Sequence, residues 1–210
     1  TVAWQLAGKR TFAFEGSAFI AGASIQFLRD QFAFLTKASD SEALATNESA
    51  APEIYFVPAL AGLGAPHWNA RARGAFFGLT RGTSQGQLIR AALESMAFQV
   101  NDLMTAMAAD LGAPFKMLRV DGGAVANNLL MQAQANITQV PVDRPANLET
   151  TAFGAALIAG LGVGLYGGLS ELTHVRKTER IFNPEPNTKE QYAAHRDGWK
   201  RAVKAAIAFA

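Results

Sequence analysis

The stretch RVDGGAVANNLL, residues 119–130, decides the fold, because it joins an acid and two glycines to the end of an apolar run. The preceding KMLRV, 116–120, has the composition of a short strand, and GAVANNLLMQAQANI, 123–137, has apolar residues at helical spacing. A strand that ends in a glycine-rich loop and feeds a helix is typical of an α/β sheet, where ligands bind beyond the carboxyl ends of strands. The stretch therefore predicts an α/β fold and a ligand-binding loop.

The residue types in this loop favour a nucleotide as the ligand. Gly122 and Gly123 let a ligand approach the backbone, and the start of the following helix offers N–H groups and a positive dipole end. Asn127 is expected about one turn into that helix, where its amide reaches the edge of a base. From these residues alone a second interpretation stays open, in which the glycines form a tight turn and Asp121 caps the helix.

Strands and helices alternate on both sides of this stretch. Upstream, IYFVP (54–58) and AFFGL (75–79) read as strands, and 84–111 as the longest helix, which Gly112 ends. Downstream, VPVDRP (140–145) reads as a strand, followed by helices over 151–162 and from Thr188 onward. This order favours α/β layers with some parallel strands. The polar stretch from Lys37 to Pro52 is poorly patterned, with a short helix expected at Ser41 to Thr46.

Two further segments carry expectations about the surroundings of this core. The first residues read as two short β runs joined at Ala7, Gly8 and Lys9, which predicts that the chain begins inside a sheet of a longer protein. Residues 150–170 carry no charge, but their many Gly and Ala residues predict a buried helix rather than a membrane span. The G-x-G-x-x-G pattern that begins at Gly162 follows a helix, so we interpret it as a helix end and turn, not a dinucleotide site.

Composition excludes several classes of function. The 210 residues are 50% hydrophobic, which allows one substantial core and one domain or at most two. A net charge of +2 without a Lys/Arg run argues against nucleic acid as a partner. The absence of Cys excludes disulfides and thiolate metal sites and fits a cytoplasmic protein, and the 3 His residues lack metal-ligand spacing. We therefore expect no metal site in this chain and no membrane partner.

Several longer segments together resemble one known family. They are FIAGASIQFLRD (19–30), PALAGLGAPHWNARARGAFFGLTRG (58–82), VDGGAVANNLLMQ (120–132) and TAFGAALIAGLGVGLY (151–166). Together these segments closely resemble the C-terminal half of the FGGY carbohydrate kinases. The resemblance covers nearly the whole chain, and the GLGAP loop (62–66) favours the members that phosphorylate glycerol over those that act on xylulose or gluconate.

The resemblance implies an actin-like, RNase H-like ATPase domain over residues 1–210, with a mixed sheet flanked by helices, as the nucleotide-binding half of an ATP-dependent glycerol kinase. By the same resemblance, Gly123 and Asn127 contact the adenine end of ATP or ADP, and Gly22 and Gln26 contact the nucleotide from another helix start. No catalytic residue is expected in this chain. The general base, the Mg²⁺ ligands and the glycerol contacts are expected in an N-terminal domain outside it, and the full-length protein is expected to be a homo-oligomer.

Three alternatives remain open at this point. In the first, the acceptor is another polyol or sugar. In the second, the chain is an actin-like nucleotide-binding module without kinase activity. The third and most distant is a dinucleotide-binding oxidoreductase.

Individual residues also carry expectations: Trp68 and Trp199 anchor their segments by packing, and Glu94 is a buried acid with a structural role. Where the family usually has Trp-Asp-Pro, this chain has Trp68, Asn69 and Ala70, so the charge of that loop is altered.

Overall fold

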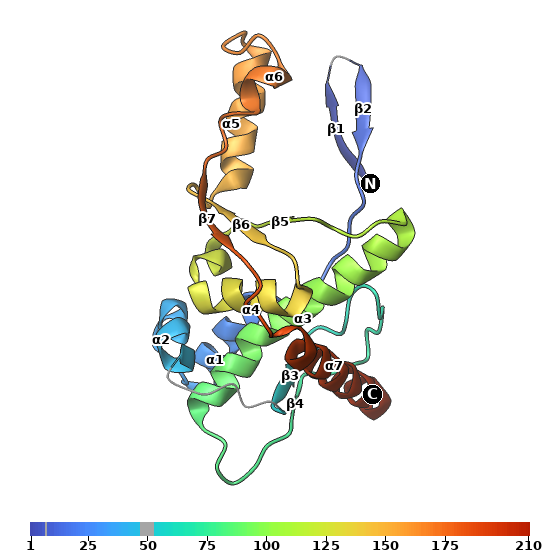
Figure 1. Ribbon diagram of the computed structural model, residues 1–210, viewed down its shortest axis with the longest axis vertical. Helices are drawn as coiled ribbons and strands as arrows, with labels where there is room; N and C mark the ends of the chain where they lie inside the picture. Colours follow the sequence, from blue (N-terminus) through green and yellow to red (C-terminus); the bar gives the residue numbers. More distant parts are fainter. Residues whose placement is uncertain (7, 47–52) are drawn as a thin grey trace.

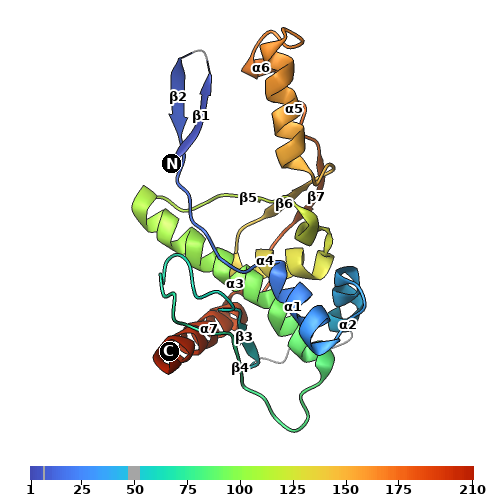
Figure 2. The same ribbon diagram turned by 180° about the vertical axis from the view of Figure 1, so that it is seen from behind.

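The computed structural model describes residues 1–6, 8–46 and 53–210, and its body is built around one long helix (Figures 1 and 2). The end of the polar stretch (47–52) and Ala7 of the first turn lie outside the described residues. The elements are β1 (Val2–Leu6), β2 (Lys9–Phe12), α1 (Ala23–Phe32), the 3₁₀ turn η1 (Ala38–Asp40), α2 (Ser41–Thr46), β3 (Tyr55–Val57), β4 (Ala75–Phe77), α3 (Gln85–Leu111), β5 (Leu118–Arg119), the 3₁₀ turn η2 (Gly123–Ala126), α4 (Asn128–Thr138), β6 (Val142–Pro145), α5 (Thr150–Gly162), α6 (Leu169–Leu172), β7 (Thr178–Phe182) and α7 (Lys189–Phe209).

Helix α3 is the central element, and local sequence signals fix both of its ends. Ser84 accepts a hydrogen bond from the Gln87 amide while the Gln87 side chain accepts one from the Ser84 amide, which forms a capping box. Gly112 ends the helix in the left-handed conformation that glycine favours, at φ 67°. Residues 91–98 are buried on all faces, because α1, α2, α4 and β3 pack around this part of the helix. The expected helix over 84–111 is confirmed.

A three-stranded mixed sheet lies beside α4. Strand β6 is central and fully buried, runs parallel to β5, and pairs antiparallel with β7. The α/β class and the mixed sheet flanked by helices are therefore confirmed. The same topology places the carboxyl end of β5 directly before the glycine-rich loop, as the alternation of elements predicts.

Helix α7 closes the opposite side of α3. Trp199 is 1% exposed, stacks on Phe98 with ring centroids 5.3 Å apart, and donates its indole N–H to Asp102 at 2.7 Å. The expected anchoring role of Trp199 is confirmed. Glu94 is also buried as expected, and Arg90, one helical turn before it, donates to its carboxylate at 2.9 Å. The expectation for Trp68 is wrong, because this residue is 70% exposed. Its ring contacts the Phe19 ring edge-on.

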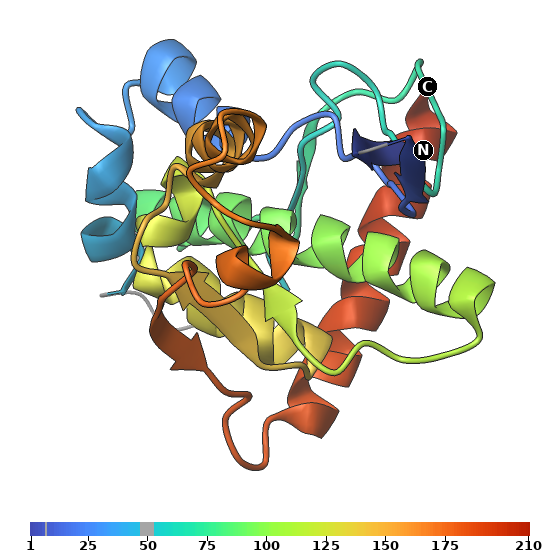
Figure 3. The same ribbon diagram turned by 90° about the horizontal axis from the view of Figure 1, so that it is seen from above.

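Two projections extend from this body, the β1–β2 hairpin and the α5–α6 arm (Figure 1), and the view from above shows both of them end-on (Figure 3). The prediction of a buried helix within residues 150–170 is wrong, since Gly160 is the only buried residue of α5. Ile158 is 56% and Leu165 71% exposed. Small residues permit close packing, but within the described residues this helix has little to pack against. No described helix is both long and apolar enough to cross a membrane.

The segment after Gly122 also differs from expectation in its local geometry. Gly123–Ala126 forms a 3₁₀ turn, and the α-helix begins only at Asn128. Asn127 separates the two with an extended conformation, φ −75° and ψ 113°. The expected single helix from Gly123 is therefore interrupted at Asn127, and this break shapes the site described next.

Candidate functional site

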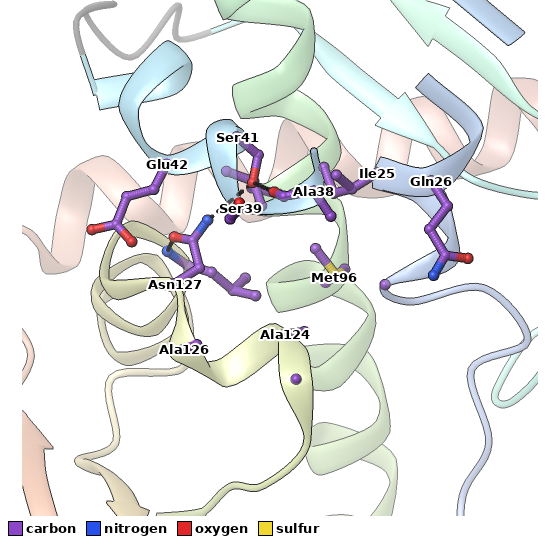
Figure 4. A pocket seen from close by; sticks show the side chains of 14 residues that line it. Ile25, Gln26, Ala38, Ser39, Ser41, Glu42, Met96, Ala124, Ala126 and Asn127 are labelled. Atoms are coloured by element: carbon purple, nitrogen blue, oxygen red, sulfur yellow. Dashed lines mark hydrogen bonds between the residues drawn. The ribbon is translucent and has the colours of Figure 1, made fainter. Parts of the chain in front are cut away.

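A pocket of about 530 Å³ opens between α1, the η1–α2 segment, α3 and the η2–α4 segment (Figure 4). All four residues expected to contact a nucleotide line it. They are Gly22, Gln26, Gly123 and Asn127. Its volume lies within the range of about 300–1,000 Å³ that is usual for small-molecule sites. The chain therefore gathers residues that are as far apart in sequence as α1 and α4 around one cavity large enough for a ligand.

The glycine-rich loop forms one wall of the pocket. Gly122 has φ 85° and ψ 172°, a conformation that residues with a side chain rarely adopt, so this glycine is required by the backbone. Gly123 has open space where a Cβ atom would lie. Ala124 and Ala126 continue the wall along η2. The loop thus presents backbone and small side chains to any molecule in the pocket.

Asn127 has a structural task as well as a place on the pocket wall. It is the N-cap of α4, with its side-chain oxygen accepting from the Leu130 amide at 2.9 Å. Its amide nitrogen donates to the Ser41 hydroxyl at 3.3 Å. The amide has two N–H groups and its oxygen two lone pairs, so one donor and one acceptor remain. Asn127 is therefore not one turn into the helix, as expected, but at its start.

Glu42 closes the start of α4 from the other side of the pocket. Its carboxylate accepts from the backbone N–H of Asn128 and from the Asn128 side-chain amide, both at 3.0 Å. The expectation of free N–H groups at this helix start is wrong for the amides of Asn128 and Leu130, which are already paired with side chains. A negative charge already occupies this helix end, so it favours a neutral or amino-bearing group over a phosphate.

The floor of the pocket is apolar. Leu93 and Met96 of α3 and Ile25 of α1 lie there, while Ser39 and Ser41 add hydroxyl groups from the η1–α2 segment. An apolar floor with a few polar groups at the edge suits a flat heterocyclic ring. Sequence reasoning missed Ser41 and Glu42, because 86 residues separate Glu42 from Asn128. The only local signal was the expected short helix over 41–46, which α2 matches.

The opposite end of the pocket is formed by the start of α1. Gly22 precedes the helix, and a Cβ atom on it would lie 4.0 Å from the Ala124 side chain across the pocket. Gln99 of α3 donates to the Ile20 carbonyl at 2.9 Å, which ties this segment to the central helix. Gln26, on the first turn of α1, extends its amide along the same side (Figure 4).

Asp121, at the foot of the glycine loop, does not cap α4. Its carboxylate accepts a hydrogen bond from the Thr150 hydroxyl, so it links the loop to the start of α5. Within residues 1–6, 8–46 and 53–210, no three His, Asp or Glu side chains gather as a metal-binding group.

Comparison with known proteins defines the family. Residues 2–163 match the model of the FGGY family of carbohydrate kinases, C-terminal domain. This chain belongs to the FGGY family of carbohydrate kinases. Among curated relatives, it is 53% identical over 203 residues to a glycerol kinase of Carboxydothermus hydrogenoformans, covering 97% of this chain and 40% of the relative. It is 52% identical over 210 residues to a glycerol kinase of Burkholderia pseudomallei, covering 100% of this chain and 42% of the relative.

Solved structures agree with the family assignment. The crystal structure of Plasmodium falciparum glycerol kinase with ADP matches with a TM-score of 0.78 and 28% identity, covering 88% of this chain and 37% of that one. A ligand-bound xylulose kinase from Lactobacillus acidophilus has the same TM-score at 24% identity, covering 90% and 39% of the two chains, and so shows the shared fold alone. The chain spans about two fifths of the length of the curated relatives it matches.

Proposed function

We propose that this chain is the nucleotide-binding part of an ATP-dependent kinase whose acceptor is glycerol. The observation that carries the proposal is the convergence of Gly22, Gln26, Gly123 and Asn127 on one pocket of suitable size. The relatives support the choice of reaction, because they are glycerol kinases and one solved relative is a complex with ADP. The pocket holds the adenine end of the nucleotide.

The polar groups of the pocket support this orientation of the nucleotide. Asn127 keeps one N–H donor and one oxygen lone pair, a pair that matches the adjacent donor and acceptor on an adenine edge. Glu42 places a carboxylate beside Asn127, which repels phosphate and guanine carbonyl oxygens but accepts from an amino group. The phosphates therefore extend away from Glu42, past the glycines of the wall.

The rest of the reaction requires groups from outside this chain. Phosphoryl transfer needs a base or positioning group for the acceptor hydroxyl and cations that neutralise the transferring phosphate. Among the described residues, no three His, Asp or Glu side chains gather as a metal-binding group. We propose that an N-terminal domain of the whole protein supplies the Mg²⁺ ligands, the base and the glycerol contacts. The whole protein is proposed to act in the cytoplasm as a homo-oligomer.

The experiment that tests the proposal has two parts. Calorimetric titration of ADP and GDP into the protein that contains this chain should show tighter binding of ADP, because Asn127 and Glu42 suit the adenine edge, where an amino group lies beside the ring acceptor and guanine has a carbonyl oxygen instead. A coupled assay of the same protein with ATP and glycerol, xylulose or gluconate should show turnover with glycerol. The isolated 210-residue chain should show no glycerol phosphorylation. Absence of ADP binding at millimolar concentration, or turnover only with another acceptor, would refute the corresponding part.

A further inference from the structure

Arg144 connects the sheet to the pocket wall. It lies on the buried strand β6, is 7% exposed, and has its guanidinium 5.0 Å from the centre of the Phe182 ring. Its Nη1 atom donates to the carbonyl oxygens of Val125 at 3.0 Å and Ala126 at 3.3 Å. These carbonyls belong to η2, the turn whose residues line the pocket. Arg144 therefore touches the wall from behind, not the cavity.

The break between η2 and α4 explains why these two carbonyls use a side chain as donor. In an uninterrupted α-helix, the Leu130 amide would donate to the carbonyl of Ala126, four residues earlier. Here the Leu130 amide donates instead to the side chain of Asn127, so the helical ladder does not include Ala126. A guanidinium presents several N–H groups in a fixed plane and remains charged, so one side chain can serve both carbonyls.

Glu179 fixes the other side of the guanidinium. Its carboxylate accepts from Nε of Arg144 at 2.8 Å, and this hydrogen bond lowers the pKa of the Glu179 carboxyl. The guanidinium is thus held between β7 on one side and η2 on the other. A Lys at this position would keep the charge but lose the planar fork that reaches both sides.

We propose that Arg144 is a positioning residue for nucleotide binding: it holds the η2 turn in the conformation that fits the ligand. The inference rests on the proposed function of the pocket. When a binding-competent state is only partly populated, the apparent dissociation constant rises by the inverse of its population. Loss of the Arg144 contacts lets the turn leave that state, and ADP binding weakens although no atom of Arg144 touches ADP.

The chain offers a matched control in Arg176, which binds Asp143, the residue next to Arg144 on the same strand. Asp143 is 4% exposed and accepts from Arg176 at 2.7 Å and from Thr178 at 2.9 Å. Burial raises the pKa of the Asp143 carboxyl, but these hydrogen bonds and the nearby arginines outweigh burial and hold the pKa below its usual value. This ion pair stabilises the same sheet from its β7 side, and the hydrogen bonds of Arg176 go to Asp143 and Thr178 rather than to η2.

The experiment compares Arg144→Lys with Arg176→Lys in the whole protein that contains this chain. Each variant is studied well below its thermal midpoint, by ADP titration and by hydrogen exchange of the backbone amides of residues 123–127. We expect Arg144→Lys to weaken ADP binding by about tenfold, the effect of losing one to two hydrogen bonds that order the turn. The Val125 and Asn127 amides, which donate within the turn at 3.2 and 3.3 Å, should exchange faster. Arg176→Lys should leave both measurements near wild type.

The two readouts separate this inference from the proposed function. If wild-type protein fails to bind ADP, the proposed function falls, while hydrogen exchange still decides whether Arg144 orders the turn. If exchange over residues 123–127 is unchanged in Arg144→Lys, or if Arg176→Lys has an equal effect on exchange and binding, the positioning role is overturned. Kinetics of the active enzyme provide a further readout: KM for ATP should rise while kcat and KM for glycerol stay close to wild type.

Discussion

Replacing Asn127 separates its structural task from its proposed task in the pocket. In Asn127→Ala the N-cap bond to the Leu130 amide and the longer bond to Ser41 are both lost. Removal of an N-cap costs about 1 kcal/mol, and the 3.3 Å bond adds a smaller amount, so the expected loss of stability is about 1–1.5 kcal/mol. For a domain of 210 residues, that corresponds to a thermal midpoint lower by about 2–6 °C.

Asn127→Ser supplies the matched control. Serine is as good an N-cap as asparagine, so this variant should unfold within about 0.5 kcal/mol of wild type. Both substitutions remove the amide that we propose contacts the base, and two lost hydrogen bonds correspond to about a tenfold weakening of ADP binding. Thermal unfolding without nucleotide and calorimetric titration with ADP give the two quantities independently. Wild-type ADP affinity in Asn127→Ser would refute the role of the amide in base recognition.

Two further predictions concern the packing of α7 against the core. Gly198→Ala should destabilise the protein by about 1–3 kcal/mol in denaturant unfolding, because the new methyl group overlaps the Tyr55 phenol. Adding Tyr55→Phe should recover part of that loss, and a neutral result for Gly198→Ala alone would contradict the packing. The pKa of His195 is lowered from its usual value of 6.5, mainly by burial. His195 therefore binds a proton more readily in the unfolded chain than in the folded protein. Stability should therefore fall as pH decreases below about 6.5, more steeply than in His195→Gln, and parallel pH profiles would disprove this.

Short-range signals explain how much of the site could be predicted from sequence. Gly123 and Asn127 follow a strand within a few residues, so their shared wall is a matter of local geometry. Glu42 could not be assigned to the pocket, because its contact with Asn128 depends on how α2 and α4 pack across α3. The break at Asn127 could not be predicted for another reason: a 3₁₀ turn has about 3.0 residues per turn against about 3.6 in an α-helix, and the 4 residues of η2 are too few for apolar spacing to show that difference.

The errors in the fold have a related cause. A run of small and apolar residues in α5 indicates that the helix is able to pack closely, but it does not identify a neighbour, and Ile158 is exposed in this chain. Trp68 illustrates the same limit, since a large aromatic ring favours burial on average and yet lies 70% exposed on its loop. Trp199 was predicted correctly because its helical spacing placed it on the inner face of α7.

The 86 residues between Glu42 and Asn128 also set the order in which the pocket is completed during synthesis. At about 5–20 residues per second, the ribosome adds Asn128 roughly 4–17 s after Glu42. Arg144, which supports the wall from behind, follows later still. The proposed nucleotide pocket, with its support from Arg144, is therefore complete only after strand β6 has been synthesised, so any binding of nucleotide there belongs to a late stage in the synthesis of this part of the protein.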